Sequence, residues 1–205
     1  PDVVVAESNG AVQEIPYEKL LVSVGRRAVT DGLGLETLGV KLERGAITVD
    51  RYMQTSVPGI YAIGDVNGVS MLAHTAAHEG VVAVDHILGG KEEMRYHAIP
   101  GIVYSNPEIA SVGRTEQELQ QGGAAYQVHR VPMTLSGRFV IENEQANGIC
   151  KILTDESGVI LGVHLLGNGS SEILVPAVMA VQCALKLSDL AKVVFPHPTV
   201  CEVLR

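Results

Sequence analysis

The sequence predicts a mixed α/β region followed by an α+β domain, and three observations support this prediction. The chain has 205 residues, of which 46% are hydrophobic but only two are Phe and none is Trp, so its core consists of Val, Ile, Leu and Ala. In the first half, short β-rich runs precede one long helical pattern, and in the second half strands precede two helices. A polar stretch around residue 95 separates the halves and indicates a domain boundary.

The first half is expected to begin with a β-hairpin and to end with an amphipathic helix. Asn9-Gly10 predicts the hairpin turn, because this pair accepts the positive φ angles that a tight turn needs. Gly89-Gly90 predicts the C-terminal end of the helix. The expected elements are strands over 3–7, 11–15 and 19–25, a turn-rich stretch over 26–45, a strand pair over 46–50 and 59–65, and a helix over 71–90.

The second half has the clearer pattern. Thr115 and Glu118 have the spacing of a capping box, and Gly122 is placed to end the short helix that they begin. The expected order is an extended segment over 101–113, a helix over 115–123, a strand over 125–133, a hairpin over 148–167, and helices over 170–185 and 187–194.

The helix over 170–185 is apolar on more than one face. A helix of this kind is buried on more than one side. Two interpretations are equally supported by the pattern: the helix contacts another subunit, or it lies at the centre of a monomer's core.

Composition excludes several classes of protein. The net charge of −8 is spread over short acidic clusters, whereas a nucleic-acid surface needs a concentrated Lys/Arg stripe. No apolar run approaches the roughly 20 residues of a membrane span, and the first residues do not resemble a signal peptide. Cys150, Cys183 and Cys201 are isolated in the sequence, which is typical of structural thiols in a reducing compartment. We expect a cytoplasmic protein that binds neither nucleic acid nor membranes.

Both ends of the chain suggest a longer protein. The chain starts within an apolar strand and has no initiator Met, and it stops at Arg205, where "TVCEVLR" looks like the opening turns of a helix. We therefore expect this sequence to be a portion of a larger chain.

A Gly-Asp pair after an apolar run is the first candidate for a ligand site. Gly64 and Asp65 end the run "GIYAIGD", and in α/β proteins nucleotides bind at this end of a strand. A carboxylate there accepts hydrogen bonds from ligand hydroxyls, although Gly-Asp is also an ordinary turn. The helix that follows begins with the four residues Met71 to His74, whose free N–H groups attract an electron-rich ligand.

The second candidate is His197, which lies between Pro196 and Pro198. Histidine is the commonest general base near neutral pH, and a proline on each side restricts the backbone that carries it, with a His-Pro bond open to the cis form. The simpler interpretation is a histidine in a proline-rich turn. Glu202 has two possible roles: it has the capping-box spacing from Thr199, and its carboxylate could instead bind and orient the imidazole.

These segments together resemble the flavoprotein disulfide reductases with two dinucleotide-binding domains, the class I pyridine nucleotide-disulfide oxidoreductases. The strand, Gly-Asp, loop and helix over "GIYAIGDVNGVSMLAHTAAHEG" are similar to the family's second flavin-contacting segment. "LLVSVGRRAVTDGLGLE" resembles its passage from the nicotinamide domain to the flavin domain, with Ala28 where the family usually has Pro. "GIVYSNPEIASVG", "LSGRFVIENEQANGICKIL", "ILGVHLLG" and "FPHPTVCE" are similar to its dimer-forming domain, within the dihydrolipoamide dehydrogenase branch.

The resemblance implies a domain for each part of the chain and a role for each candidate residue. Residues 1–22 would end an NAD-binding domain, 23–95 would form the second segment of an FAD-binding domain, and 96–205 would form the interface domain. The implied cofactor-binding residues are Gly25 for NAD, Gly64 for close approach of the ligand to the backbone, Asp65 for the ribityl chain of FAD, and Met71, Leu72, Ala73 and His74 for the flavin ring. The implied catalytic residues are His197 as proton acceptor and Glu202 as its support.

The implied reaction is the oxidation of dihydrolipoamide, with electrons passing through a redox disulfide and FAD to NAD+. In this family the His acts at the active site of the partner subunit, so a homodimer is implied, together with a 2-oxo acid dehydrogenase complex or the glycine cleavage system as partner. The redox disulfide belongs to an N-terminal region, and the three cysteines of this chain do not have its spacing.

Two alternatives stay open at the level of sequence. The parent could be a sister enzyme, glutathione or mercuric reductase, because the Gly-Asp strand and the His-Pro-Thr turn occur across the whole superfamily. The chain by itself could also be a dimerisation module without activity or bound FAD.

Overall fold

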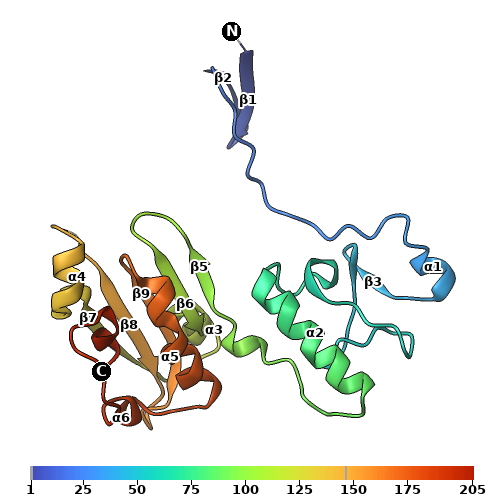
Figure 1. Ribbon diagram of the computed structural model, residues 1–205. Helices are drawn as coiled ribbons and strands as arrows, with labels where there is room; N and C mark the ends of the chain where they lie inside the picture. Colours follow the sequence, from blue (N-terminus) through green and yellow to red (C-terminus); the bar gives the residue numbers. More distant parts are fainter. Residues whose placement is uncertain (1, 146) are drawn as a thin grey trace. The chain divides into compact units, whose positions relative to one another are not determined.

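The computed structural model describes residues 2–145 and 147–205, and the chain divides into two compact units (Figure 1). Unit 1 ends at Glu92, and unit 2 runs from Glu93 to Arg205. The division falls within the polar stretch that separates the two halves of the sequence.

Unit 1 begins with the predicted hairpin, which is confirmed. Strands β1 (Asp2–Ser8) and β2 (Ala11–Tyr17) pair antiparallel from Asp2–Tyr17 to Ser8–Ala11. Asn9 and Gly10 have φ angles of 52° and 78°, as expected for a two-residue turn whose twist matches the strands.

The strand predicted over residues 19–25 is wrong. This segment has neither helix nor strand, and its apolar side chains are exposed, with Leu21 at 89% and Val24 at 92%. A strand is held by backbone hydrogen bonds to a neighbouring strand. Among the described residues of unit 1, none pairs with this run in a named strand, so an apolar run alone does not make it one.

The middle of unit 1 folds around a small aliphatic core of Leu35, Val40, Ile47 and Ala62. The elements here are the helix α1 (Leu35–Leu38), the paired strands β3 (Leu42–Glu43) and β4 (Ala46–Ile47), the 3₁₀ helix η1 (Gly64–Asn67) and the helix α2 (Ala73–Ile87).

The predicted pairing of 46–50 with 59–65 is wrong, because β4 pairs with β3 instead, and residues 59–65 make only an isolated bridge from Tyr61 to Gln54. The predicted helix is confirmed, but it starts later than expected. Its N-cap is Leu72, which leaves Met71 in the preceding loop.

Unit 2 is built on a five-stranded antiparallel sheet in the order β5-β6-β9-β8-β7. Its strands are β5 (Gly101–Val103), β6 (Ile109–Gly113), β7 (Gln127–Pro132), β8 (Ile149–Thr154) and β9 (Ile160–Leu166). The extended segment over 101–113 thus forms two strands, and the predicted β8–β9 hairpin is confirmed.

The helices of unit 2 are mostly short. They are η2 (Tyr96–Ala98), α3 (Glu116–Gln121), η3 (Met133–Leu135), α4 (Gly137–Glu142), α5 (Ser170–Gln182), α6 (Leu187–Leu190) and η4 (Val200–Leu204). The predicted capping box is present at α3, where Thr115 and Glu118 exchange hydrogen bonds between side chains and backbone N–H groups.

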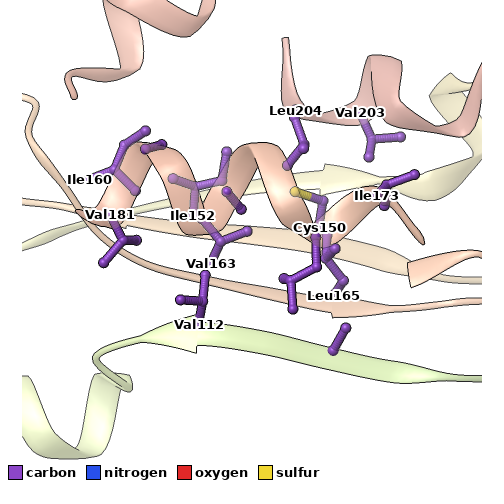
Figure 2. Close-up of a cluster of buried hydrophobic side chains, with 14 of the residues drawn as sticks. Val112, Cys150, Ile152, Ile160, Val163, Leu165, Ile173, Val181, Val203 and Leu204 are labelled. Atoms are coloured by element: carbon purple, nitrogen blue, oxygen red, sulfur yellow. The ribbon is translucent and has the colours of Figure 1, made fainter. Parts of the chain in front are cut away.

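Helix α5 covers one face of the sheet and forms the main core with it. Side chains of Val112, Ile152 and Val163 point from the sheet toward Ile173 and Val181 of the helix (Figure 2). Cys150 and Ile152 of β8 and Val163 and Leu165 of β9 enter this core with the two-residue periodicity of a strand. A register shift beside Leu153 and Thr154 brings Ile160 into the core out of this alternation.

The other face of α5 is open within this chain. Val175 and Met179 are 61% and 60% exposed, on the side of the helix away from the buried Ile173, Ala177 and Ala180. The 205 residues of this chain therefore do not enclose the helix on all sides.

Candidate functional site

His197 lies in the loop between α6 and η4, and its imidazole is well exposed. The side chain is 78% accessible, and the His197–Pro198 peptide bond is cis. Pro196 and Pro198 flank it, as the sequence requires. The ring is therefore open to a reactant on the side that faces solvent.

Glu202, in η4, orients this ring. His197 Nδ1 lies 3.0 Å from Oε1 and 3.2 Å from Oε2 of Glu202, whose side chain is only 19% exposed. An ionised carboxylate only accepts hydrogen bonds, so Nδ1–H is the donor, and the lone pair of the ring is on Nε2. This is the tautomer in which a histidine acts as a base through Nε2.

The two roles that the sequence leaves open for Glu202 occur together. Its Oε2 accepts the backbone N–H of Thr199 at 2.9 Å, while its carboxylate also binds His197. Hydrogen bonds from the Thr199 backbone and then from the His197 side chain lower the pKa of Glu202 below its ordinary value of 4.5. One ionised carboxylate therefore starts η4 and aims the imidazole.

Two further contacts hold the loop and were not predicted. Ser136 Oγ–H donates to the backbone oxygen of Thr199 at 2.9 Å, and Thr199 Oγ1–H donates to the backbone oxygen of Pro196 at 2.8 Å. Ser136 also caps α4 by accepting from the N–H of Phe139 at 3.2 Å. The signal in the sequence was the serine before "GRFV", which is a good N-cap residue.

The second candidate group lies in unit 1, around the Gly-Asp pair. Gly64 begins η1 with a φ of +75°, a conformation that suits glycine, and a Cβ there would lie 3.2 Å from Cβ of Ala76. Asp65 follows with an exposed side chain. The turn thus presents one carboxylate outward from a tightly packed backbone.

The start of α2 lies shortly after this turn. Its N-cap residue, Leu72, makes no side-chain capping hydrogen bond, and Ala73 and His74 open the helix. The first N–H groups of a helix have no partner within the helix and bear a partial positive charge. Unit 1 therefore offers two kinds of ligand group. The Asp65 carboxylate can accept hydrogen bonds from ligand hydroxyls, and the amide N–H groups at the start of α2 can donate to an electron-rich ring.

Gly25 lies in the irregular segment before α1. It is exposed with a φ of +102°, and a Cβ there would meet no atom within 4 Å. Its backbone conformation suits glycine.

The three cysteines are free. Cys150 is buried in the core of unit 2, where burial raises the pKa of its thiol to about 12, and burial also raises the pKa of Cys201. Cys183 is exposed at the end of α5. A high pKa disfavours the reactive thiolate, so Cys150 is a structural core residue.

Two features are absent from residues 2–145 and 147–205. Within these ranges no group of three or more His, Cys, Asp or Glu is arranged to hold a metal ion, and no helix combines the length and apolar character of a membrane span.

The fold and these two groups define a class of protein. Residues 99–205 match the family model described as "Pyridine nucleotide-disulphide oxidoreductase, dimerisation domain", and residues 2–80 match "Pyridine nucleotide-disulphide oxidoreductase". The chain belongs to this family, as a portion of the flavin-dependent fold followed by its dimerisation domain.

Particular relatives narrow the comparison. The chain is 40% identical over 199 residues to mitochondrial dihydrolipoyl dehydrogenase of Caenorhabditis elegans, covering 96% of this chain and 40% of that protein. It is 38% identical to dihydrolipoyl dehydrogenase 3 of Pseudomonas putida, covering 97% of this chain and 42% of that protein. The human mitochondrial enzyme is 40% identical, at 98% and 40% coverage. The chain thus spans about two fifths of the length of these relatives.

Solved structures agree with this result. LpdA from Mycobacterium tuberculosis superposes with a TM-score of 0.87 at 30% identity, covering 98% of this chain and 46% of that one. The HOCl-induced flavoprotein disulfide reductase RclA from Escherichia coli gives 0.84 at 29% identity, covering 100% and 47%. The predicted fold class and the predicted family are confirmed.

Proposed function

We propose that this chain is part of a flavoprotein that oxidises dihydrolipoamide to lipoamide and passes the electrons through a redox disulfide and FAD to NAD+. The observation that carries the proposal is the exposed imidazole of His197, held by Glu202 through Nδ1 so that Nε2 is the basic atom. The similarity to dihydrolipoyl dehydrogenases over nearly the whole chain supports this choice of substrate.

His197 acts on the substrate thiol in this proposal. Its Nε2 takes the thiol proton, and the thiolate attacks one sulfur of the redox disulfide, which breaks the S–S bond and forms a mixed disulfide. The second substrate thiol then releases lipoamide, and the reduced dithiol stays on the protein. The nearby Glu202 carboxylate stabilises the imidazolium that forms after proton transfer.

The proposed flavin ligands in this chain are Asp65, for the ribityl hydroxyls, and the four residues from Met71 to His74, for the ring. The outward carboxylate of Asp65 and the start of α2, whose N-cap residue has no side-chain capping hydrogen bond, fit such a group, since both are preformed within unit 1. FAD, when bound, accepts the electron pair of the dithiol and delivers it to NAD+. The proposed contribution of Gly25 to the NAD site relies on the family resemblance alone.

The 205 residues by themselves are proposed to be inactive, because none of the three cysteines is paired and Cys150 is buried. We further propose that the parent protein serves a 2-oxo acid dehydrogenase complex or the glycine cleavage system, in the cytoplasm.

Assay of the full-length protein that contains this chain is the direct test. We expect a yellow protein whose flavin is bleached by dihydrolipoamide and reoxidised by NAD+, with NADH formed in proportion. Glutathione disulfide with NADPH is the control reaction and is expected to be inert. The structural likeness to RclA supports a competing assignment to another disulfide reductase. That enzyme would prefer glutathione disulfide with NADPH to dihydrolipoamide, or would not turn over dihydrolipoamide at all.

The exposed face of α5 is proposed to contact a second copy of the chain. We expect the purified chain to be a dimer in analytical ultracentrifugation and Met179→Lys to shift it toward monomer, since a buried unpaired charge is costly. Gln182→Lys, on an exposed polar residue of the same helix, is the matched control and is expected to matter less. A wild-type monomer, or a dimer indifferent to Met179→Lys, contradicts this assignment.

A further inference from the structure

Glu79 is a buried carboxylate that neither the sequence patterns nor the proposed reaction assigns. It lies in the middle of α2 with 0% of its surface exposed. Its Oε2 accepts the backbone N–H of Gly64 at 2.6 Å and the side-chain N–H of Asn67 at 3.0 Å. A buried carboxylate is costly unless it is well hydrogen-bonded, so its presence here indicates a specific role.

These bonds connect the two ends of η1 to α2. Gly64 is the first and Asn67 the last residue of this 3₁₀ helix, and both are buried, while Asp65 between them is exposed. Asn67 continues the connection, since its Oδ1 accepts the N–H of Val69 at 2.9 Å. One carboxylate on the helix thus holds the turn before Asp65, the turn after it, and, through Asn67, the start of the next loop.

A second contact fixes the far end of the same loop. Ser70 Oγ–H donates to Oγ1 of Thr75, which is fully buried in the first turns of α2. Glu79 and Thr75 are four residues apart and therefore lie on the same face of α2. The segment from Gly64 to Ser70 is bound to this one face.

We propose that Glu79 is a positioning residue, which holds the Gly64–Asn67 turn so that the Asp65 carboxylate is in place before the flavin ribityl chain binds. This inference rests on the proposed function, because it takes Asp65 as a flavin ligand. Prepositioning matters because a ligand group that is already ordered loses no further conformational entropy on binding. Charge-assisted hydrogen bonds from Gly64 and Asn67 are the stronger kind, which suits them to this task.

Three variants remove different parts of this connection. Glu79→Ala deletes the acceptor, so the N–H groups of Gly64 and Asn67 both lose their partner. Glu79→Gln keeps an amide oxygen that can accept from both donors in place of Oε2, although these hydrogen bonds are no longer charge-assisted. Asn67→Ala breaks the connection at the far end of η1 and leaves the bond from Gly64 intact.

FAD affinity of the full-length apoprotein is the first readout, measured by the change in flavin fluorescence on titration. Glu79→Ala is expected to bind FAD about 10- to 100-fold more weakly, the range expected when buried polar groups are left without a partner. Glu79→Gln is expected to recover to within about fivefold of wild type, since it restores the acceptor oxygen. Asn67→Ala should fall between these two and tests the connection even if Glu79→Ala does not fold.

Hydrogen exchange of the Gly64 amide, measured without FAD, is the second readout. Exchange should be much faster in Glu79→Ala and close to wild type in Glu79→Gln. FAD binding that is as weak in Glu79→Gln as in Glu79→Ala, or unchanged FAD binding in Glu79→Ala despite faster Gly64 exchange, overturns the positioning role. Unchanged FAD binding in Asn67→Ala overturns it as well.

A fourth variant separates this inference from the proposed function. If Asp65→Ala leaves FAD affinity unchanged, the flavin assignment itself fails and the positioning proposal fails with it. The Gly64 exchange rates still report in that case whether Glu79 holds the turn, so the two failures are distinguishable.

Discussion

Replacing His197 by Gln in the full-length protein is expected to lower dihydrolipoamide oxidation by about 10²- to 10⁴-fold, the usual contribution of a positioned general base. The amide of Gln keeps a polar group of similar size but does not accept a proton near neutral pH. Flavin absorption should be unchanged, since the substitution removes only the proton acceptor. Steady-state NADH formation and the visible spectrum measure the two effects separately.

A matched control uses the same substitution at His78, which is exposed on α2 and has no proposed role in catalysis. His78→Gln is expected to retain turnover within about twofold of wild type, as surface substitutions usually have small effects. Unchanged turnover in His197→Gln, or equal losses in both variants, would contradict the assignment of the base.

The lowered pKa of Glu202 sets the pH range over which its carboxylate can hold the His197 imidazole. Because the folded-state pKa lies below the ordinary value, the hydrogen bonds of the carboxylate stabilise the loop fully above that value, and this contribution is lost as pH falls through the lowered pKa. When Glu202 is protonated, its carboxyl group also loses the negative charge that favours a hydrogen bond from His197 Nδ1–H. The orientation of the His197 imidazole by Glu202 should therefore be kept at neutral pH and be lost only at acidic pH.

Replacing Phe139 by Ala is expected to reduce the free energy of unfolding by about 3–5 kcal/mol, the cost usually found for a large aromatic in a core. The Phe139 side chain is fully buried, and its ring lies so close to Gly167 that a Cβ there would be 2.9 Å from Cε2. The void left by Ala cannot be filled by Gly167, which has no side chain. Urea unfolding of the chain, followed by circular dichroism, measures the loss.

Ile141→Ala is the control for this prediction, because Ile141 lies in the same helix but is 79% exposed. Its expected effect is within about 0.5 kcal/mol. A loss below about 1 kcal/mol in Phe139→Ala would show that the ring is not a core anchor.

Local patterns in the sequence predicted the elements whose stability is local. The Asn9-Gly10 turn, the Thr115–Glu118 capping box and the alternating strands of the β8–β9 hairpin are all present as expected. In each case the residues that specify the element are close in the chain, so the local sequence is enough to predict it. The same holds for His197 and Glu202, which are five residues apart and meet at 3.0 Å.

Several of the errors share a cause, which is that the deciding partner is distant in sequence. Residues 19–25 have the composition of a strand but no neighbouring strand among the described residues of unit 1. Helix α4 was missed because it is short and is anchored by a single buried ring, Phe139. The importance of Glu79 could not be seen either, since a glutamate in a helix is normally a solvated residue.

The sequence by itself determined the family of this protein and the division into an α/β and an α+β part, and it gave the pairing of His197 with Glu202 as one of two possible roles, because these depend on motifs and short spacings. Only the tertiary structure decided that Glu202 serves the turn and the imidazole at once, that α5 leaves Val175 and Met179 exposed, and that Glu79 binds a turn 15 residues away. Such contacts depend on which distant segments pack together, and that packing is a property of the whole unit rather than of any short stretch of chain.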